Sequence, residues 1–162
     1  MLNSDRLLIL SKEEDNKRYI SELYEVCKDE LFQEYLHMPL AQSGDDFERK
    51  IGMSFIRTEC KCFLGRSKID EKLVCFMILN GLSRYCLVYG VLPEYRNQGY
   101  GRELVKTVSE SLGVPIDASV RWNNIASQKC LTAAGFKQID PQFKVHRPYD
   151  VSKLPVHYRY EP

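Results

Sequence analysis

The chain has 162 residues, of which 44% are hydrophobic and 28% are charged, and its formal net charge is +1. These proportions fit a soluble domain with one hydrophobic core, and they exclude a disordered chain or a protein with a dense Lys/Arg block for nucleic acid. The longest apolar runs, residues 7–10 and 73–79, are too short for a signal peptide or a membrane span. We therefore expect one domain, residues 1–162, in a cytoplasmic protein that binds neither nucleic acid nor membrane.

Charges and cysteines are distributed unevenly along the chain. Residues 1–50 contain 12 Asp/Glu and 7 Lys/Arg, whereas residues 51–162 contain 10 and 16. An anionic cofactor docked on the basic part would leave the acidic part to face a cationic amine.

The six cysteines lie mostly in apolar stretches, and Cys60-x-Cys62 lacks the second ligand pair that a zinc site needs. We expect free thiols and no metal site.

The first 57 residues predict one strand followed by helices. Residues 7–10 have the composition of a short strand, and residues 11–14 read Ser-x-x-Glu, the pattern of a capping box at a helix start. Apolar residues then recur at three- and four-residue spacing up to His37, which predicts one long helix or two consecutive helices. A third helix is expected over residues 45–55.

Three strands with short connections are predicted next, over residues 60–64, 73–79 and 85–91. Connections of this length suit antiparallel pairing, and Asn80-Gly81 is typical of a tight turn. The middle strand is apolar on both faces, so we expect helices to cover both sides of the sheet.

Residues 91–102 join the last of these strands to an amphipathic helix. Pro93 ends the strand, and apolar residues at helical spacing begin at Leu104. Gly99 and Gly101 remove side chains where backbone N–H groups would approach a ligand or where φ would be positive. Such a helix start presents unpaired N–H donors and the positive end of the helix dipole, which attract phosphate oxygens. The junction therefore predicts an anion-binding site.

The junction also resembles the acetyl-CoA signature of the GNAT superfamily of N-acetyltransferases. The match comprises Arg-x-x-Gly-x-Gly at Arg96, Gly99 and Gly101 and the preceding Val-x-Pro-Glu-Tyr. An ordinary strand–turn–helix junction is the alternative, and a dinucleotide fingerprint would need a third glycine near Leu104. The resemblance implies that acetyl-CoA is bound by Val91, Leu92, Arg96, Asn97, Gln98, Gly99, Tyr100, Gly101 and Arg102.

A second GNAT-like motif follows a strand predicted over residues 116–122. Asn124 suits the cap of a helix that ends at Gly135. The superfamily pattern Asn-x-x-Ala/Ser, followed by Gly-Phe, is matched in register by Asn124, Ser127 and Gly135-Phe136. The resemblance therefore adds Asn124 and Ser127 to the expected CoA-binding residues.

One position departs from the superfamily pattern. Many members have a tyrosine beside the CoA sulfur, and this chain has Leu131 there. The departure looks more like the branch of ribosomal-protein N-terminal acetyltransferases, in which a serine at the position of Ser127 serves the sulfur. An ordinary capping hydroxyl is the alternative for Ser127. We expect Leu131 to lie at a surface beside the sulfur and to accept tyrosine without loss of the fold.

The resemblance implies the GNAT fold, an α/β (α+β) architecture. Its mixed, mostly antiparallel sheet has six or seven strands, with helices on both faces. Residues 1–57 would supply the first strand and the acceptor-side helices, residues 58–140 the acetyl-CoA-binding core, and residues 141–162 the C-terminal strands. Within this tail, residues 156–160 predict a strand and residues 143–146 a second one.

The implied activity is direct transfer of an acetyl group from acetyl-CoA to a primary amine of a small molecule, peptide or protein N-terminus. A backbone N–H near Val91 would stabilise the oxyanion if the neighbouring strands splay there. Residues 85–92 lack the carboxylate base of some members, which leaves Asp117, Glu34 or a water chain as the base, with Ser127 serving the sulfur. A non-catalytic acetyl-CoA sensor or partner module is the alternative function. We expect a monomer or homodimer.

Overall fold

The computed structural model describes residues 1–11, 23–24, 28, 43, 45–46, 60–81, 84–139 and 155–162. In this part of the chain, eight strands form one sheet in the order β1-β2-β3-β4-β5-β6-β8-β7. The strands are β1 (Leu2–Asn3), β2 (Leu7–Ser11), β3 (Cys60–Ser67), β4 (Leu73–Asn80), β5 (Tyr85–Val91), β6 (Ile116–Val120), β7 (Lys137–Ile139) and β8 (Val156–Tyr160). The helices are α4 (Tyr100–Leu112) and α5 (Ile125–Ala133), and a 3-10 turn, η1, spans Pro93–Tyr95.

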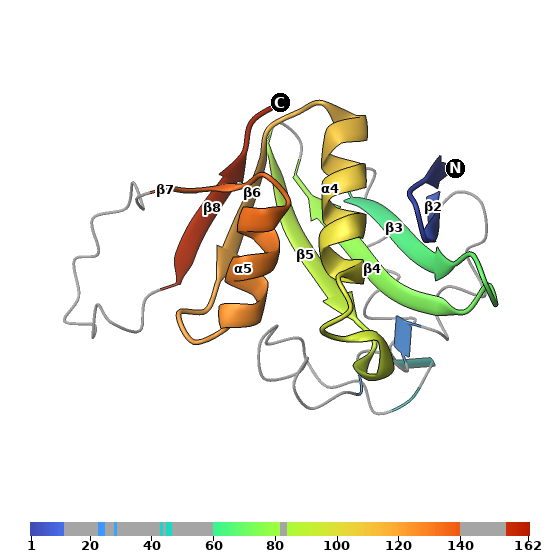
Figure 1. Cartoon of the computed structure of the whole chain (residues 1–162). Coiled ribbons are helices and arrows are strands. Elements are labelled where there is room, and N and C mark those ends of the chain that lie inside the picture. The colour runs from blue at the N-terminus through green and yellow to red at the C-terminus, as the bar shows by residue number, and fades with distance from the viewer. Residues whose placement is uncertain are drawn as a thin grey trace.

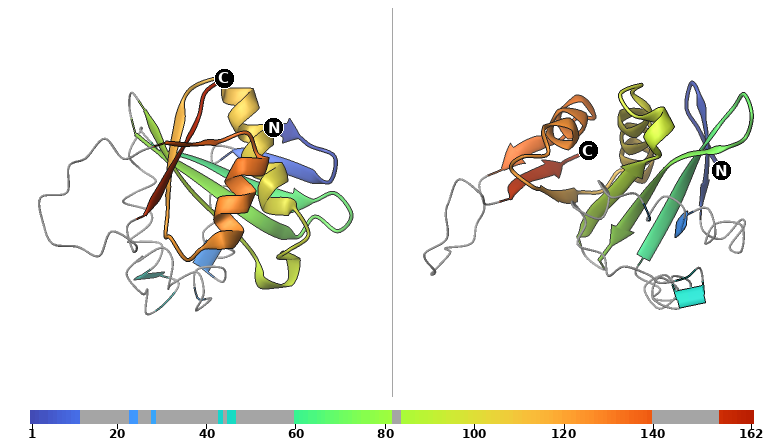
Figure 2. Two further views of the ribbon diagram at one scale, coloured as in Figure 1. Left: turned by 60° about the vertical axis from the view of Figure 1, so that its left-hand side comes forward. Right: turned by 90° about the horizontal axis from the view of Figure 1, so that it is seen from below.

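The two helices lie side by side on one face of a twisted sheet (Figures 1 and 2). Strand pairs are antiparallel throughout, except that β5 and β6 run parallel because α4 connects them on that face. None of the described helices is long and apolar enough to cross a membrane. The described part of the chain therefore has the mixed, mostly antiparallel architecture that the sequence predicts.

Strand β4 lies at the centre of the sheet and is buried along almost its whole length. All seven residues from Leu73 to Leu79 are buried, in agreement with their apolar character on both faces. Helix α4 packs on this region through Leu104, Val105 and Val108, each fully buried. The helix ends where Gly113 adopts a left-handed conformation with φ 58°. The apolar stripe predicted after residue 103 is therefore confirmed as core.

The observed sheet differs from the prediction in the number of strands. Strands β1 and β7 are not expected from the sequence because each is only two or three residues long and contains polar residues. They form by pairing with β2 and β8, respectively, so the sheet has eight strands instead of six or seven. The helices predicted over residues 12–57 and the strand predicted over residues 143–146 lie largely outside the described residues.

The parallel junction between β5 and β6 is short. Only Tyr85 and Cys86 of β5 are in register with residues of β6, namely Ile116 and Asp117. In contrast, β5 pairs with β4 from Cys86 to Val91. The two parallel strands therefore separate after Cys86, and the edge of β5 from Leu87 onward faces a gap in the sheet.

Candidate active site

Two backbone N–H groups of β5 face the gap. Leu92 donates its N–H to the Val74 carbonyl oxygen at 2.9 Å, so this residue hydrogen-bonds toward β4. Adjacent residues of an extended strand direct their N–H groups to opposite sides, and Val91 and Tyr89 therefore point theirs toward β6. Because β6 pairs with β5 only as far as Cys86, these donors have no backbone partner on β6, and they face the gap.

The turn that follows β5 forms a second set of backbone donors. Asn97 and Gly99 have positive φ values of 60° and 85°, and α4 starts immediately afterwards at Tyr100. The N–H of Glu103 makes the bond to Gly99 that opens the helix, at 3.0 Å, and no side chain caps the helix start. The preceding amides and the positive end of the helix dipole therefore meet at an uncapped helix start, the geometry expected from the sequence of this junction.

Gly101 lies in a closely packed region. A Cβ atom at this position would lie 3.0 Å from Cγ2 of Val91 and 3.3 Å from Cε2 of Tyr89. The backbone of Gly101 is not left-handed. The positive φ values in this junction are those of Asn97 and Gly99. Its function is to let the first turn of α4 approach β5, which brings the helix start next to the open strand edge.

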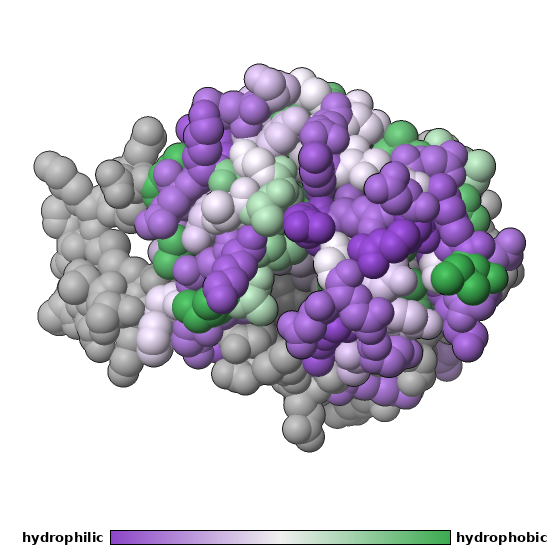
Figure 3. Space-filling view, viewed as in Figure 1, coloured by the Kyte–Doolittle hydropathy of each residue, from purple (hydrophilic) through white to green (hydrophobic). Residues whose placement is uncertain are grey.

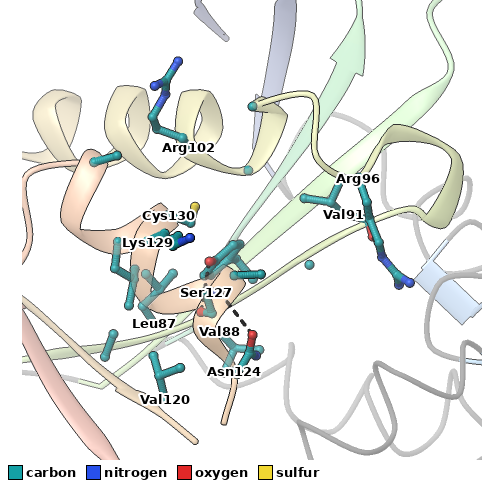
Figure 4. A pocket seen from close by; sticks show the side chains of 18 of the residues that line it. Leu87, Val88, Val91, Arg96, Arg102, Val120, Asn124, Ser127, Lys129 and Cys130 are labelled. Carbon is teal, nitrogen blue, oxygen red and sulfur yellow. Dashed lines mark hydrogen bonds between the residues drawn. The ribbon is translucent and has the colours of Figure 1, made fainter. Parts of the chain in front are cut away.

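A cavity of about 810 Å³ connects these features and extends between α4 and α5. Figure 4 shows Asn124 and Ser127 of α5 across the cavity from Val91 and Arg96. On the molecular surface, a paler strip of neutral and hydrophobic residues separates hydrophilic regions on this face (Figure 3). Nine of the expected CoA-binding residues line the cavity: Val91, Arg96, Asn97, Gln98, Gly99, Gly101, Arg102, Asn124 and Ser127.

Two of the expected CoA-binding residues do not line the cavity. Leu92 lies in the ladder to β4 through its bond to Val74. The ring of Tyr100 lies under the guanidinium of Arg6, with 4.2 Å between the Arg6 Cζ and the ring centroid.

Among the described residues, no group of three or more His, Cys, Asp or Glu side chains has an arrangement that could hold a metal ion.

Asn124 and Ser127 form the first turn of α5. The Asn124 Oδ1 accepts the N–H of Ser127 at 3.1 Å, so the predicted cap is confirmed. The Oγ of Ser127 accepts a hydrogen bond from the hydroxyl of Tyr89 at 3.0 Å. Burial, together with the neighbouring Cys130, raises the pKa of Tyr89 well above its usual value, so the phenol stays protonated and remains a donor.

The family profile described as "Acetyltransferase (GNAT) family" matches residues 20–136. This chain belongs to the GNAT family. The matched segment includes the helix start at Tyr100, the gap beside β5 and the first turn of α5. A search of curated proteins finds no significant match.

Solved structures with the same fold as this GNAT protein include several acetyltransferases. The spermidine N-acetyltransferase of Vibrio cholerae, in complex with CoA and spermine, has a TM-score of 0.75 at 12% identity, covering 96% of this chain and 94% of that one. RimL, a ribosomal alpha-N-protein acetyltransferase in complex with coenzyme A, has a TM-score of 0.76 at 14% identity, with coverages of 98% and 95%. A GNAT-family acetyltransferase of Bacillus anthracis has a TM-score of 0.73 at 17% identity, with coverages of 98% and 95%.

The structure places Asp117, one of the predicted base candidates of this GNAT protein, outside the described cavity lining. Asp117 lies on β6, where its carboxylate accepts hydrogen bonds from Arg159 at 2.7 and 3.3 Å and lies 3.6 Å from Arg84 Nη1. It is absent from the cavity wall, and both of its oxygens are engaged by cations. Glu34 lies outside the described residues. Asp117 therefore receives no support as the base, and Glu34 stays a prediction.

The expectation for Leu131 is wrong. This side chain lines part of the cavity wall but is fully buried in the hydrophobic core, so it is not a surface residue. A tyrosine at this position would have to displace packed neighbours, and overpacking of this kind is destabilising. Leucine here contributes to the core of the GNAT fold, and the hydroxyl available at α5 is that of Ser127.

The start of α4 is fixed by a contact that sequence reasoning missed. Arg6, in the turn between β1 and β2, pairs with Glu103 through Nε and Nη2, at 2.8 and 2.7 Å. Glu103 also accepts the Arg6 backbone N–H at 2.7 Å and the Ser4 hydroxyl at 2.6 Å, and Arg6 donates through Nη1 to the Gln98 carbonyl at 3.0 Å. The N-terminal hairpin thereby holds the turn before α4 in place.

The charge state of Glu103 follows from these contacts. Burial opposes its ionisation, but the hydrogen bonds from Ser4 and Arg6 outweigh burial and hold the pKa of Glu103 below its usual 4.5. The folded state thus favours the ionised carboxylate. Its stabilising contribution is present above pH 4.5 and is lost as the pH falls through the lower pKa of the folded protein.

Replacing Glu103 with glutamine should lower the free energy of unfolding by about 1–2 kcal/mol at pH 7, because a glutamine cannot accept all of these hydrogen bonds or pair with the guanidinium. The difference between wild type and variant should shrink as the pH falls below 4.5, as measured by urea unfolding across a pH series. Glu110→Gln is the matched control, since among the described residues Glu110 makes an exposed pair with Lys106 on the same helix and no other ion pair. A pH-independent loss for Glu103→Gln would contradict the assigned charge state.

Proposed function

We propose that this GNAT protein transfers an acetyl group from acetyl-CoA directly to a primary amine. The observation that carries the proposal is that the open edge of β5 and the uncapped start of α4 border one cavity. The start of α4 suits the diphosphate of CoA, and the edge of β5 suits the extended pantetheine arm and its thioester. One face of the protein thus offers a diphosphate site and a pantetheine site next to each other, as these two parts follow each other in CoA.

The charges around the cavity support the binding of an anionic cofactor. Arg96, Arg102, Arg121 and Lys129 line it, and none of the described lining residues is acidic. Backbone donors at a helix start bind phosphate oxygens most effectively where the surrounding potential is positive. Gly101 adds to the fit because the absence of its Cβ permits the close approach between α4 and β5.

The residues at the gap supply two of the functions that acetyl transfer needs. The N–H of Val91 is positioned to donate to the thioester carbonyl, whose oxygen becomes negatively charged when the amine attacks. The hydroxyl of Ser127 lies on the opposite wall of the cavity, where it would donate a hydrogen bond to the departing sulfur. The cavity and the strand edge together would hold the thioester and the attacking amine in the orientation that the reaction needs.

The acceptor must arrive as a neutral amine. An alkyl amine with a pKa near 10.4 is mostly charged at pH 7, a handicap of roughly 4–5 kcal/mol, whereas an N-terminal α-amine with a pKa near 8 carries a handicap of about 1–1.5 kcal/mol. Because no carboxylate or imidazole is present among the described residues that line the cavity, this chemistry favours an α-amine or a base from residues 12–59, most of which lie outside the described part. The fold neighbours include a spermidine and an α-N-protein acetyltransferase, which are examples of both acceptor classes.

The cysteines are compatible with a cytoplasmic enzyme. Cys62, Cys75, Cys86 and Cys130 are free thiols, and the burial of Cys75 raises its pKa far above the usual value, which makes that thiol unreactive. Thiols in this state persist in a reducing compartment. We propose that the protein acts in the cytoplasm.

The decisive experiment measures the release of free thiol from acetyl-CoA against a panel of polyamines, aminoglycosides and peptides with free N-termini. We expect at least one acceptor to raise the rate above the hydrolytic background, with one acetyl group found on the acceptor by mass spectrometry. If CoA raises the melting temperature but no acceptor is acetylated, the protein is an acetyl-CoA-binding module instead. If CoA does not stabilise the protein, the proposed site is wrong.

A further inference from the structure

Tyr89 is in direct contact with the catalytic side of the cavity, although no sequence motif includes it. It lies on β5 two residues before Val91, and its side chain lines the cavity wall. One edge of its ring lies against Gly101, since a Cβ there would approach Tyr89 Cε2 to 3.3 Å. The ring is thus confined between its own strand and the first turn of α4, and its hydroxyl reaches α5.

The hydroxyl of Tyr89 determines which hydrogen-bonding positions of Ser127 remain available. The backbone of Ser127 is fixed by the Asn124 cap, and Oγ accepts the Tyr89 hydroxyl at 3.0 Å. A serine hydroxyl has one proton to donate and two lone pairs to accept with. When one lone pair is occupied by a donor that keeps its own proton, the serine proton must point elsewhere.

We propose that Tyr89 is a positioning residue that directs the hydroxyl proton of Ser127 into the cavity, toward the sulfur of CoA. This inference rests on the proposed acetyl transfer. The C–N bond forms as the C–S bond breaks, and the electron pair of the C–S bond stays on sulfur. The amine nitrogen gives up one proton to solvent or a base, and the sulfur leaves as a thiolate that takes up one proton from solvent. Both hydroxyls keep their protons and act only as hydrogen-bond donors, Tyr89 to Ser127 and Ser127 to sulfur.

A phenol suits this position better than a group that titrates near neutral pH. The neighbours of Tyr89 in the cavity, Cys130 and Ser127, are both uncharged at pH 7, and the pKa of Tyr89 is raised. The hydrogen bond that the Tyr89 hydroxyl donates to Ser127 is therefore present at every pH at which an amine acceptor reacts. Cys130 is hydrogen-bonded to Tyr89 as well. Burial raises the pKa of its thiol, so the sulfur stays protonated at neutral pH and is a weaker acceptor for the phenol proton than the Ser127 oxygen.

The test is a double-mutant cycle in which rates are measured over a range of acetyl-CoA concentrations up to saturation, with an acceptor found by the thiol-release assay. Tyr89→Phe removes one oxygen atom and should lower kcat roughly three- to tenfold, with the KM for acetyl-CoA within about twofold of wild type. Ser127→Ala should cost at least as much, and the double variant should be no slower than Ser127→Ala alone, because Tyr89 acts only through that serine. CoA-induced stabilisation of each variant verifies that it is folded.

Tyr85→Phe is the matched control because it removes the same hydroxyl from the same strand outside the cavity lining. It should leave kcat unchanged. Additive losses in the double variant, or a Tyr89→Phe variant as active as wild type, would overturn the role of Tyr89 while leaving acetyl transfer established. If wild-type protein acetylates nothing, the proposed function fails and the inference fails with it.

Discussion

Replacing Gly99 with glutamate is expected to abolish the thermal stabilisation that CoA confers on the protein. A ligand at a hundred times its Kd stabilises the folded state by about 2.7 kcal/mol, which for a chain of this length corresponds to a rise in melting temperature of roughly 5–11 °C. The new side chain would begin at the uncapped start of α4, where a Cβ atom would lie 3.5 Å from Arg6 Nη2 and 3.8 Å from Arg102 Nη2, and its negative charge would repel the diphosphate. Differential scanning fluorimetry with and without CoA measures the effect.

The backbone at Gly99 requires a control, because φ of 85° strains any residue with a side chain. Gly113→Glu provides it: this glycine also has positive φ, 58°, ends the same helix, and leaves open space within 4 Å of where a Cβ atom would stand. Gly113→Glu should lower the melting temperature of the free protein but retain the full CoA shift. A Gly99→Glu variant that also retains the shift would show that CoA does not bind at the helix start.

Replacing Val91 with proline should lower kcat by about 100- to 1000-fold, the usual cost of removing one oxyanion donor. Proline lacks the N–H that Val91 directs into the gap. The ladder to β4 does not use this N–H, because the neighbouring Leu92 makes the bond to Val74, and a strand edge without a partner is a position that tolerates proline. Steady-state kinetics on the acceptor identified by thiol release measure the loss.

Two further variants separate the donor from the side chain. Val91→Ala keeps the N–H and removes the methyl groups near Gly101, so its kcat should stay within about threefold of wild type. Leu92→Pro removes a ladder bond instead, and it should lower the unfolding free energy by about 1–3 kcal/mol. A folded Val91→Pro protein with wild-type kcat would exclude the Val91 N–H as the oxyanion donor.

The sequence was most informative where a local rule determines the backbone. Strand β4 is an apolar run, Asn124 is a cap, and Gly99 adopts the left-handed conformation that the turn before α4 requires. Each of these depends on residues within a few positions along the chain. For the same reason the turn before α4 and the start of that helix could be located to within a residue or two from the sequence alone.

Contacts between distant residues could not be predicted in this way. Arg6 and Glu103 are 97 positions apart, and Tyr89 and Ser127 are 38 apart, so no periodicity links them. Alternation along β5 places Tyr89 on the same face as Val91 and could have marked it as a polar-tipped residue among core positions. Nothing in the sequence distinguishes a leucine at position 131 that faces the core from one that faces a ligand.

The short junction between β5 and β6 divides the sheet into two parts. Strands β1 to β5 form one continuous ladder and β6, β8 and β7 form another, and only the pairs at Tyr85 and Cys86 join them in the backbone. A cofactor seated in the gap would hydrogen-bond to one ladder and pack on the helix that belongs to the other. Cosubstrate would then act as a structural bridge, and the rigidity of the enzyme would depend on its occupancy.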